Sequence, residues 1–304
     1  VIGDLLNKIN IDSSKIDEVI MGNVLSANLG QAPATQAAIG AKLIYSTECM
    51  TINKVCGSGL KAVMLADQSI KMKNSNIAIA GGMESMSKAP HYLENSRGGT
   101  IFGHSKAIDS IIKDGLWDPH NDLAMGNCAE VLCKEEKYTR KMQDDYALMS
   151  YERANNAIKN GAFNNELCEV KIKNKKGITI IRQDEEPLKF DQNKFSKLKP
   201  AFDNGGTITA ANASSLSDGA ASIMILSEDS VESENIKPIA KIINHASFAM
   251  KPIYFTKAPV FAIKKVLEKA KMKLDEIDLF EINEAFSCVS MFAIEELDLN
   301  YEKV

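Results

Sequence analysis

The sequence of 304 residues lacks the short patterns that identify several common classes of protein. Its six cysteines form no CxxC pair and no cluster with histidine at zinc spacing, so neither a disulfide scaffold nor a zinc ribbon is expected. It contains no GxxxxGK[ST] and no GxGxxG, the glycine-rich sequences that cradle the phosphates of ATP or NAD. No apolar run approaches the roughly 18 residues that span a bilayer, so we expect no membrane partner.

The chain also lacks an excess of positive charge. Its formal net charge is −4 at pH 7, whereas a protein that binds the phosphate backbone usually has a basic excess. We therefore expect no nucleic-acid partner. Dispersed cysteines are typical of a reducing, intracellular compartment, and the sequence leaves cytoplasm and mitochondrion equally open.

Both ends of the sequence look cut. Residue 1 is valine, and residues 1–9 already have the apolar spacing of an amphipathic helix without an N-cap before it. The last residues, 301–304, follow directly on a helical pattern with no closing element. We therefore expect a truncated chain.

Short apolar runs alternate with helical patterns in the first 90 residues. Strands are predicted over 18–24, 50–55 and 77–80, and helices over 31–43 and 59–73. This alternation favours an α/β fold with a mostly parallel sheet. From about residue 91 to 210 glycine, asparagine, lysine and aspartate become frequent, with a helix at 143–160, which indicates an inserted loop domain.

The strand and helix pattern returns after the insertion. Strands are predicted over 222–226, 239–244 and 277–282, and helices over 259–270 and 285–297. Residues 16–20 and 277–281 share an Ile-Asp start after a helix, which is either an echo of a duplicated α/β half or chance. The predicted organisation is a first half at 1–90, the insertion at 91–210, a return to the first half at 211–235, and a second half at 236–304.

Cys56 lies in the segment VCGSG, where a predicted strand turns into a predicted helix. Free N–H groups and the helix dipole at such a position favour a thiolate, and the flanking glycines leave room for a substrate. A backbone N–H of the same turn can hold an oxyanion. Cys56 is therefore either a nucleophile or a buried structural cysteine, which is the more common fate of a free cysteine.

A catalytic thiol usually needs a base, and the local sequence supplies no clear one. The four histidines, none of which lies in a tight motif, are His91, His104, His120 and His245. Asn283 follows the predicted strand that ends at residue 282, where a carboxamide can serve an oxyanion or simply cap a helix. The small residues of 209–214 would let a ligand lie along the backbone, or form an ordinary loop.

Taken together, these segments resemble the thiolase family. The matching stretches, in collinear order, are residues 23–39, NKVCGSGLKA at 53–62, AGGMESMS at 80–87, TAANASSLSDGAA at 209–221 and EINEAFS at 281–287. Within the family the chain looks most like the acetoacetyl-CoA type. The resemblance implies a duplicated, five-layered α/β/α/β/α core with an inserted loop domain, and a homodimer or homotetramer.

The resemblance also implies an acyltransferase reaction and a set of residues for it. Cys56 would take an acetyl group from acetyl-CoA, a second acetyl-CoA would attack that thioester, and Asn283 would hold a water in the oxyanion hole. No cofactor is expected to be tightly bound, since coenzyme A thioesters are the substrates. The positions that match the family's CoA site are Leu116, Met125, Lys199, Phe202, Ala210, Ser214, Phe255, Ala285 and Phe286.

The sequence departs from the family pattern in three places. The family's GHP histidine, which activates the cysteine, and its CxGGG cysteine are expected only after Val304. Ala124 stands where many relatives have a histidine that contacts substrate, and Lys199 stands where many have arginine.

Several alternatives stay open. They are a 3-ketoacyl-CoA thiolase of broader chain length, a decarboxylating ketoacyl synthase, and a lipid-carrier relative or catalytically incomplete fragment. Similarity to the potassium-binding branch implies a possible potassium ion at Tyr151 and the carbonyls of Ala210, Ala211 and Ala213.

Overall fold

The computed structural model describes residues 1–99, 101–175, 177–195 and 197–304. The chain forms two compact units. Unit 1 consists of Val1–Trp117 and Leu216–Ile243, and unit 2 of Asp118–Ser215 and Asn244–Val304.

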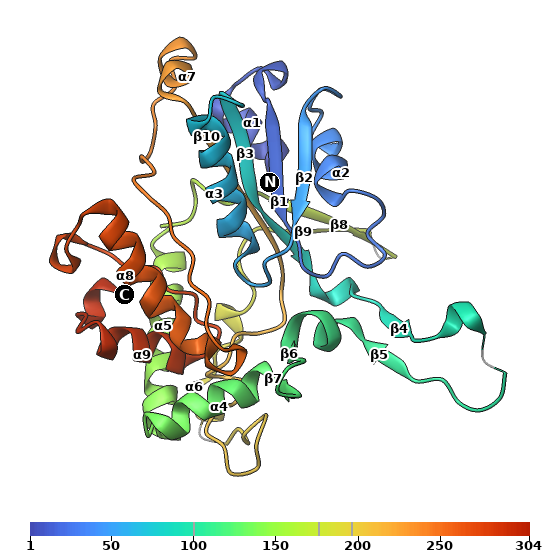
Figure 1. Ribbon diagram of the computed structural model, residues 1–304, viewed down its shortest axis with the longest axis vertical. Coiled ribbons are helices and arrows are strands. Elements are labelled where there is room, and N and C mark those ends of the chain that lie inside the picture. The colour runs from blue at the N-terminus through green and yellow to red at the C-terminus, as the bar shows by residue number, and fades with distance from the viewer. Residues whose placement is uncertain (100, 176, 196) are drawn as a thin grey trace. The chain divides into compact units, whose positions relative to one another are not determined.

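Unit 1 is built around a four-stranded sheet with the order β10-β3-β1-β2 (Figure 1). β1 runs parallel to β2 and β3, and β10 runs antiparallel to β3. A hairpin of β4 and β5 extends away from this sheet. The elements of unit 1 are α1 (Ile2–Ile9), β1 (Glu18–Gly22), α2 (Pro33–Gly40), β2 (Glu48–Ile52), α3 (Ser58–Lys71), β3 (Ile77–Ser85), β4 (His91–Leu93), β5 (Ala107–Asp109), β10 (Asp218–Leu226) and α7 (Glu228–Ser233).

Helices cover both faces of the four-stranded sheet, because its central strands carry apolar side chains on both faces. Val19 of β1 packs in a buried cluster with residues of α1 and α2. Its neighbour Ile20 packs in a second cluster with Ala62 and Ala66 of α3. Side chains alternate between the two faces of a strand, so a strand that is apolar throughout needs a layer on each face. Unit 1 is therefore a helix–sheet–helix sandwich, as the sequence predicts for an α/β fold.

Unit 2 is mostly helical, and its core surrounds α9. Every residue from Ser287 to Ile294 is buried, which identifies α9 as a central helix. Its elements are β7 (Leu123–Ala124), α4 (Met125–Glu135), α5 (Arg140–Lys159), β8 (Val170–Asn174), β9 (Gly177–Ile181), α6 (Gln192–Phe195), α8 (Ala258–Ala270) and α9 (Ser287–Glu296). The short strand β6 (Trp117–Asp118), which pairs with β7, spans the division between the units.

Two predicted strands are wrong. Residues 239–244 and 277–282 are irregular and belong to no strand. A strand exists only when a neighbour pairs with its backbone, and across the described residues no sheet includes either segment. Two of the apolar side chains that suggested burial lie in solvent, since Ile239 is 104% exposed and Leu279 is 74% exposed.

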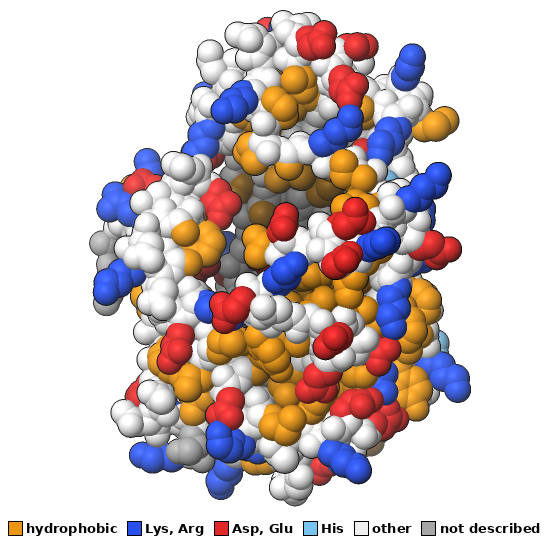
Figure 2. Space-filling view, turned by 90° about the vertical axis from the view of Figure 1, so that its left-hand side faces the viewer, with side chains coloured by type: hydrophobic (Ala, Val, Ile, Leu, Met, Phe, Trp, Pro, Cys, Tyr) orange, Lys and Arg blue, Asp and Glu red, His pale blue; other side chains and the backbone are white. Residues whose placement is uncertain are grey.

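The surface is mixed in charge. Figure 2 shows acidic and basic side chains interspersed over the face that it displays. Among the described residues, no helix combines the length and apolar character needed to cross a membrane.

Candidate active site

Cys56 lies on the short turn between β2 and α3 of unit 1. β2 ends at Ile52 and α3 begins at Ser58, with Gly57 as its N-cap. The cysteine is exposed, whereas Cys128, Cys133 and Cys288 are buried. Exposure contradicts the buried structural alternative for Cys56, and it leaves the thiol accessible to a substrate.

Hydrogen bonds from residues before and after Cys56 hold this turn in a strained conformation. Val55 has a φ of 48°, a left-handed value that is costly for a β-branched residue. The Val55 N–H donates to Asn53 Oδ1 at 2.8 Å. The Ser58 hydroxyl accepts from the Lys54 N–H at 2.8 Å and donates to the Val55 carbonyl at 2.6 Å. Strain that persists only because its surroundings enforce it is typical of functional positions.

Glycines allow the turn to approach the sheet closely. A Cβ atom added to Gly22 at the end of β1 would lie 2.6 Å from the Ser58 carbonyl carbon and 2.6 Å from its Cβ. A Cβ added to Gly82 of β3 would meet Gly59 Cα at 3.5 Å. The first turn of α3 therefore sits directly on the end of β1 and against Gly82 within β3, which fixes the height of the cysteine above the sheet.

This close approach predicts the effect of Gly22→Ala. The added methyl group overlaps Ser58 backbone, so the variant should lose about 1–3 kcal/mol of unfolding free energy and should displace the Cys56 turn. The matched control is Gly40→Ala at the end of α2, where an added Cβ meets nothing within 4 Å. The control should be neutral or stabilised by up to about 1 kcal/mol. Denaturant unfolding measures both, and equal losses in the two variants would contradict this account.

Glu84 is a positioning residue that the sequence did not reveal. Its carboxylate accepts hydrogen bonds from Asn23 Nδ2 at 2.9 Å, from the Val24 N–H at 2.9 Å and from the Leu25 N–H at 3.1 Å. Residue Asn23 is in turn bonded through its N–H to the Ile52 carbonyl at 3.0 Å. Glu84 thus holds the loop after β1 beside the strand that leads to Cys56. The available signal was an acid close after the predicted strand at 77–80, but the sequence does not show which groups this acid would bond to.

In unit 2, the loop of residues 209–214 is bonded to the segment before α9. Both the N–H and the hydroxyl of Ser214 donate to the Ala285 carbonyl, at 3.0 and 3.2 Å. The Ser287 N–H donates to the Asn212 carbonyl at 2.9 Å, and Ala213 forms an isolated bridge with Phe286. Ser214 and Ala285, which the sequence analysis assigned to one substrate site, are therefore neighbours although they lie more than 70 positions apart.

Aromatic and small side chains line the same region of unit 2. The rings of Phe202 and Phe286 meet edge to face at 6.0 Å. Asn127 Nδ2 donates to the Phe202 carbonyl at 2.8 Å, and Gly126 lies so close to the Phe202 ring that an added Cβ would approach it to 2.2 Å. Met125, Phe255 and Ala285 pack against the core cluster that contains Phe286.

Asn283 is exposed, and it does not cap α9. The N-cap is Phe286, which makes no side-chain cap, so the alternative that Asn283 serves as a helix cap is wrong. The next residue is anchored: Glu284 accepts from the Tyr146 hydroxyl at 2.9 Å and from the Ser150 hydroxyl at 2.7 Å. Burial raises the pKa of Tyr146, so its phenol stays a neutral donor.

The predicted residues divide between the units. Cys56 lies in unit 1, as does Leu116 at the end of the helical turn η4 (Ile111–Leu116). All other predicted residues lie in unit 2. Lys199 is exposed and precedes Phe202 by three positions.

Comparison with known proteins identifies the family. The model described as Thiolase, N-terminal domain matches residues 1–229, and the model described as Thiolase, C-terminal domain matches residues 236–304. The chain belongs to the thiolase family. Thus the resemblance inferred from the motifs is confirmed.

Two sequence relatives of this thiolase are named acetyl-CoA acetyltransferases. The chain is 46% identical to acetyl-CoA acetyltransferase 2 of Arabidopsis thaliana, covering 98% of this chain and 75% of the relative. It is 47% identical to the acetyl-CoA acetyltransferase of Yarrowia lipolytica, covering 97% and 73%.

Solved structures agree on the fold of the thiolase chain. A thiolase from Ascaris suum in complex with coenzyme A matches with a TM-score of 0.95 at 40% identity, covering 100% of this chain and 78% of that chain. The acetyl-CoA acetyltransferase of Bacillus anthracis matches with a TM-score of 0.96 at 33% identity, covering 100% and 77%. The predicted thiolase-like α/β fold class is confirmed.

The tyrosine predicted as a potassium ligand lies in an aromatic cluster of the thiolase chain. Tyr151 stacks on Phe190 at 5.2 Å and meets Phe195 edge to face at 5.9 Å. Its hydroxyl faces Glu186 Oε1 at 3.5 Å. Burial raises the pKa of Tyr151, so the phenol remains neutral.

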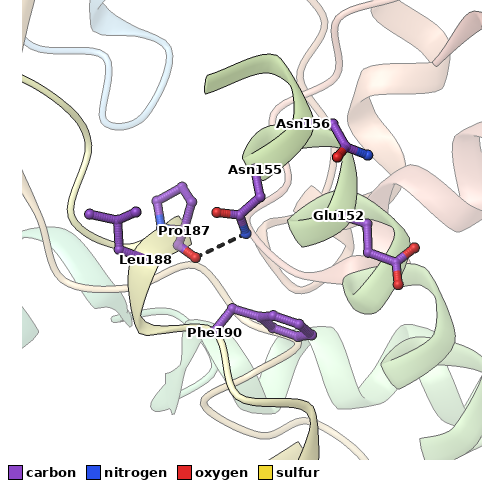
Figure 3. Close-up of a pocket in the computed structure, with 6 residues that line it drawn as sticks. All are labelled: Glu152, Asn155, Asn156, Pro187, Leu188 and Phe190. Atoms are coloured by element: carbon purple, nitrogen blue, oxygen red, sulfur yellow. Dashed lines mark hydrogen bonds between the residues drawn. The ribbon is translucent and has the colours of Figure 1, made fainter. Parts of the chain in front are cut away.

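An open pocket of about 550 Å³ lies next to this cluster (Figure 3). α5 and the segment around η5 (Pro187–Lys189) supply its walls. Asn155 Nδ2 donates to the Pro187 carbonyl at 3.0 Å and ties the two walls together. The lining residues, none of which the sequence singled out, are Glu152, Asn155, Asn156, Pro187, Leu188 and Phe190.

Proposed function

We propose that this thiolase chain is an acetyl-CoA C-acetyltransferase, which condenses two acetyl-CoA molecules to acetoacetyl-CoA and free CoA, or runs the reverse thiolysis. The observation that carries the proposal is the exposed Cys56 on its strained, hydrogen-bonded turn at the start of α3. The names of the curated relatives support the acetoacetyl-CoA type over a thiolase of broader chain length, a ketoacyl synthase or a lipid-carrier relative. The hydrogen-bonded turn around an exposed thiol favours an active enzyme over a catalytically incomplete fragment.

The proposed chemistry has two steps. First, Cys56 Sγ attacks the acetyl carbonyl carbon, the bond from that carbon to the CoA sulfur breaks, and CoA leaves as a thiol that has taken up, in net terms, the proton of the Cys56 thiol. Second, another acetyl-CoA loses a methyl proton, its carbon attacks the thioester, and the bond to Cys56 Sγ breaks. The departing sulfur takes up, in net terms, the proton lost from the methyl group, which restores the thiol. Asn283 holds the water that stabilises the enolate oxygen in this step. None of the four histidines matches the family's histidine motif, so we assign no base among them.

We further propose a CoA site with two ends. Ser214, Ala210, Ala285 and Phe286 lie along the pantetheine arm, and Lys199 and Phe202 lie toward the nucleotide end. We also assign Leu116, Met125 and Phe255 to CoA binding, because they match the family's CoA-site positions. The bonds between Ser214 and Ala285 and the contact between Phe202 and Phe286 support this grouping. An exposed lysine suits the phosphates of CoA as a point charge.

A potassium ion is a further part of the proposal. A neutral phenol and backbone carbonyls are the hard oxygen ligands that suit such a cation, so the donor set of Tyr151, Ala210, Ala211 and Ala213 fits the group. Bound there, the ion would supply positive charge that orders the 209–214 loop. The reaction rate in potassium chloride against sodium chloride at equal ionic strength tests this assignment.

We also propose an intracellular, reducing location, cytoplasm or mitochondrion, and a homodimer or homotetramer. All six cysteines are free, which is typical of a reducing compartment. The relative from Bos taurus is named mitochondrial.

The direct test is an activity assay on the protein in its natural length. Purified protein should form acetoacetyl-CoA from acetyl-CoA and should cleave acetoacetyl-CoA when CoA is added, both followed by chromatography of the thioesters. Cleavage of long 3-ketoacyl-CoA at a rate equal to that of acetoacetyl-CoA would favour the broader thiolase instead.

A further inference from the structure

A hydrogen-bonded network of three polar side chains, Arg140, Asp144 and Asn212, lies in unit 2 beside the proposed CoA site. Arg140 Nε and Asp144 Oδ2, one helical turn apart on α5, lie 2.7 Å apart. The other carboxylate oxygen, Asp144 Oδ1, accepts from Asn212 Nδ2 at 2.8 Å. The side chains of Arg140 and Asp144 are only 26% and 16% exposed, and Asn212 is 3% exposed. Water therefore screens the interactions among these three residues weakly.

At one end of this network, Arg140 holds the segment before Lys199. The two terminal nitrogens of Arg140 donate to the carbonyls of Phe195 and Leu198, at 2.7 and 2.9 Å. A planar guanidinium that also faces Asp144 fixes these carbonyls in direction as well as in distance.

The other end holds the loop of residues 207–214. Asn212 Oδ1 accepts from the Thr209 N–H at 2.8 Å, and its Nδ2 also donates to the Thr207 carbonyl at 3.2 Å. The Asn212 carbonyl accepts from the Ser287 N–H, the first residue of α9. Asn212 thus joins the loop to Asp144 through its buried side chain and to the start of α9 through its backbone carbonyl.

We propose that Arg140, Asp144 and Asn212 form a positioning network that sets the spacing between the nucleotide end and the pantetheine end of the CoA site. This inference rests on the proposed function, which assigns Lys199 to one end and Ser214 to the other. A ligand that contacts both ends gains from this fixed spacing, whereas a truncated thioester that contacts one end does not. The network therefore favours full CoA thioesters over acyl-pantetheine thioesters.

Arg140→Lys tests the first link. A lysine ammonium can keep the ion pair with Asp144, but its single nitrogen cannot hold both carbonyls in the geometry of the guanidinium. The KM for acetoacetyl-CoA should rise about tenfold with little change in kcat, whereas kcat/KM for acetoacetyl-pantetheine should stay within about twofold. An equal loss for both substrates is what a merely structural role produces, and it would overturn the proposal.

Asp144→Asn tests the second link without an activity assay. Both partners of Asp144 donate, and a carboxamide has only one acceptor oxygen, so one link must break. Amide hydrogen exchange at Thr209 and Ser287 should speed up by about tenfold, because both N–H groups donate to Asn212, which Asp144 holds. Unchanged exchange at both amides would overturn the network.

The matched control for both experiments is Asp145→Asn. Asp145 is the next residue on α5 and pairs with Lys141 at the same i,i+4 spacing, at 2.7 Å, but the two side chains are 61% and 83% exposed. The control should leave unchanged the ratio of kcat/KM for acetoacetyl-CoA to kcat/KM for acetoacetyl-pantetheine. It should also leave the amide hydrogen exchange of Thr209 and Ser287 unchanged. If the unaltered protein shows no thiolysis, the proposed function fails and with it the role in CoA binding, and the exchange experiment still decides whether the network holds the loop.

Discussion

Replacing Cys56 by alanine is expected to abolish acetoacetyl-CoA formation and cleavage, with a fall in rate of roughly 10⁴-fold or more. The reason is that the acyl group is carried on this sulfur, so its removal deletes a covalent intermediate. Because Cys56 is exposed, the variant should keep its fold and lose no more than about 0.5 kcal/mol of unfolding free energy. Coupled measurement of rate and denaturant unfolding separates these two effects.

The matched control is Cys49→Ala on β2, seven positions earlier in the same unit. Cys49 is partly buried, and its thiol donates to the Thr47 carbonyl at 3.5 Å and also interacts with the Thr35 side chain. Its variant should keep nearly full activity. Retention of most of the rate in Cys56→Ala, or an equal loss in Cys49→Ala, would show that Cys56 is not the nucleophile.

Asn283→Ala is expected to lower kcat by about 10²–10³-fold, the usual effect of removing one oxyanion-stabilising group. The side chain is exposed and caps no helix, so stability should change little. The variant should still accept an acetyl group on Cys56, because Asn283 is assigned to the second step. Rapid-quench measurement of acylation and of condensation tests this split.

Asn156→Ala, an exposed asparagine on α5, serves as the control for Asn283→Ala and should keep its activity. The assignment of Asn283 to the enolate step is contradicted if its variant loses acylation and condensation by the same factor.

Much of unit 1 could be predicted from the sequence, because its signals are local. Apolar residues on both sides of β1 and β3 require helices on both faces, and VCGSG marks the turn at which α3 begins. The sequence left Cys56 open between a nucleophile and a buried cysteine, because exposure depends on packing from distant residues. Its exposure in the structure removes the second alternative.

The errors and omissions share a physical cause, which is pairing over long sequence distances. Residues 239–244 and 277–282 have the composition of strands, but composition does not supply the neighbour that a strand needs. Likewise Glu84 bonds to residues about 60 positions away, and Asn212 to Asp144 across 68 positions. A single sequence shows the donors and acceptors but not which of them meet.

The central claim is that Cys56 carries the acyl group, and the most direct test is mass spectrometry of the natural protein before and after incubation with acetyl-CoA. The account predicts a mass increase of one acetyl group, which peptide mapping places on Cys56 and which disappears when free CoA is added. An unacetylated Cys56, or an acetyl group on a different residue that CoA does not remove, would contradict it.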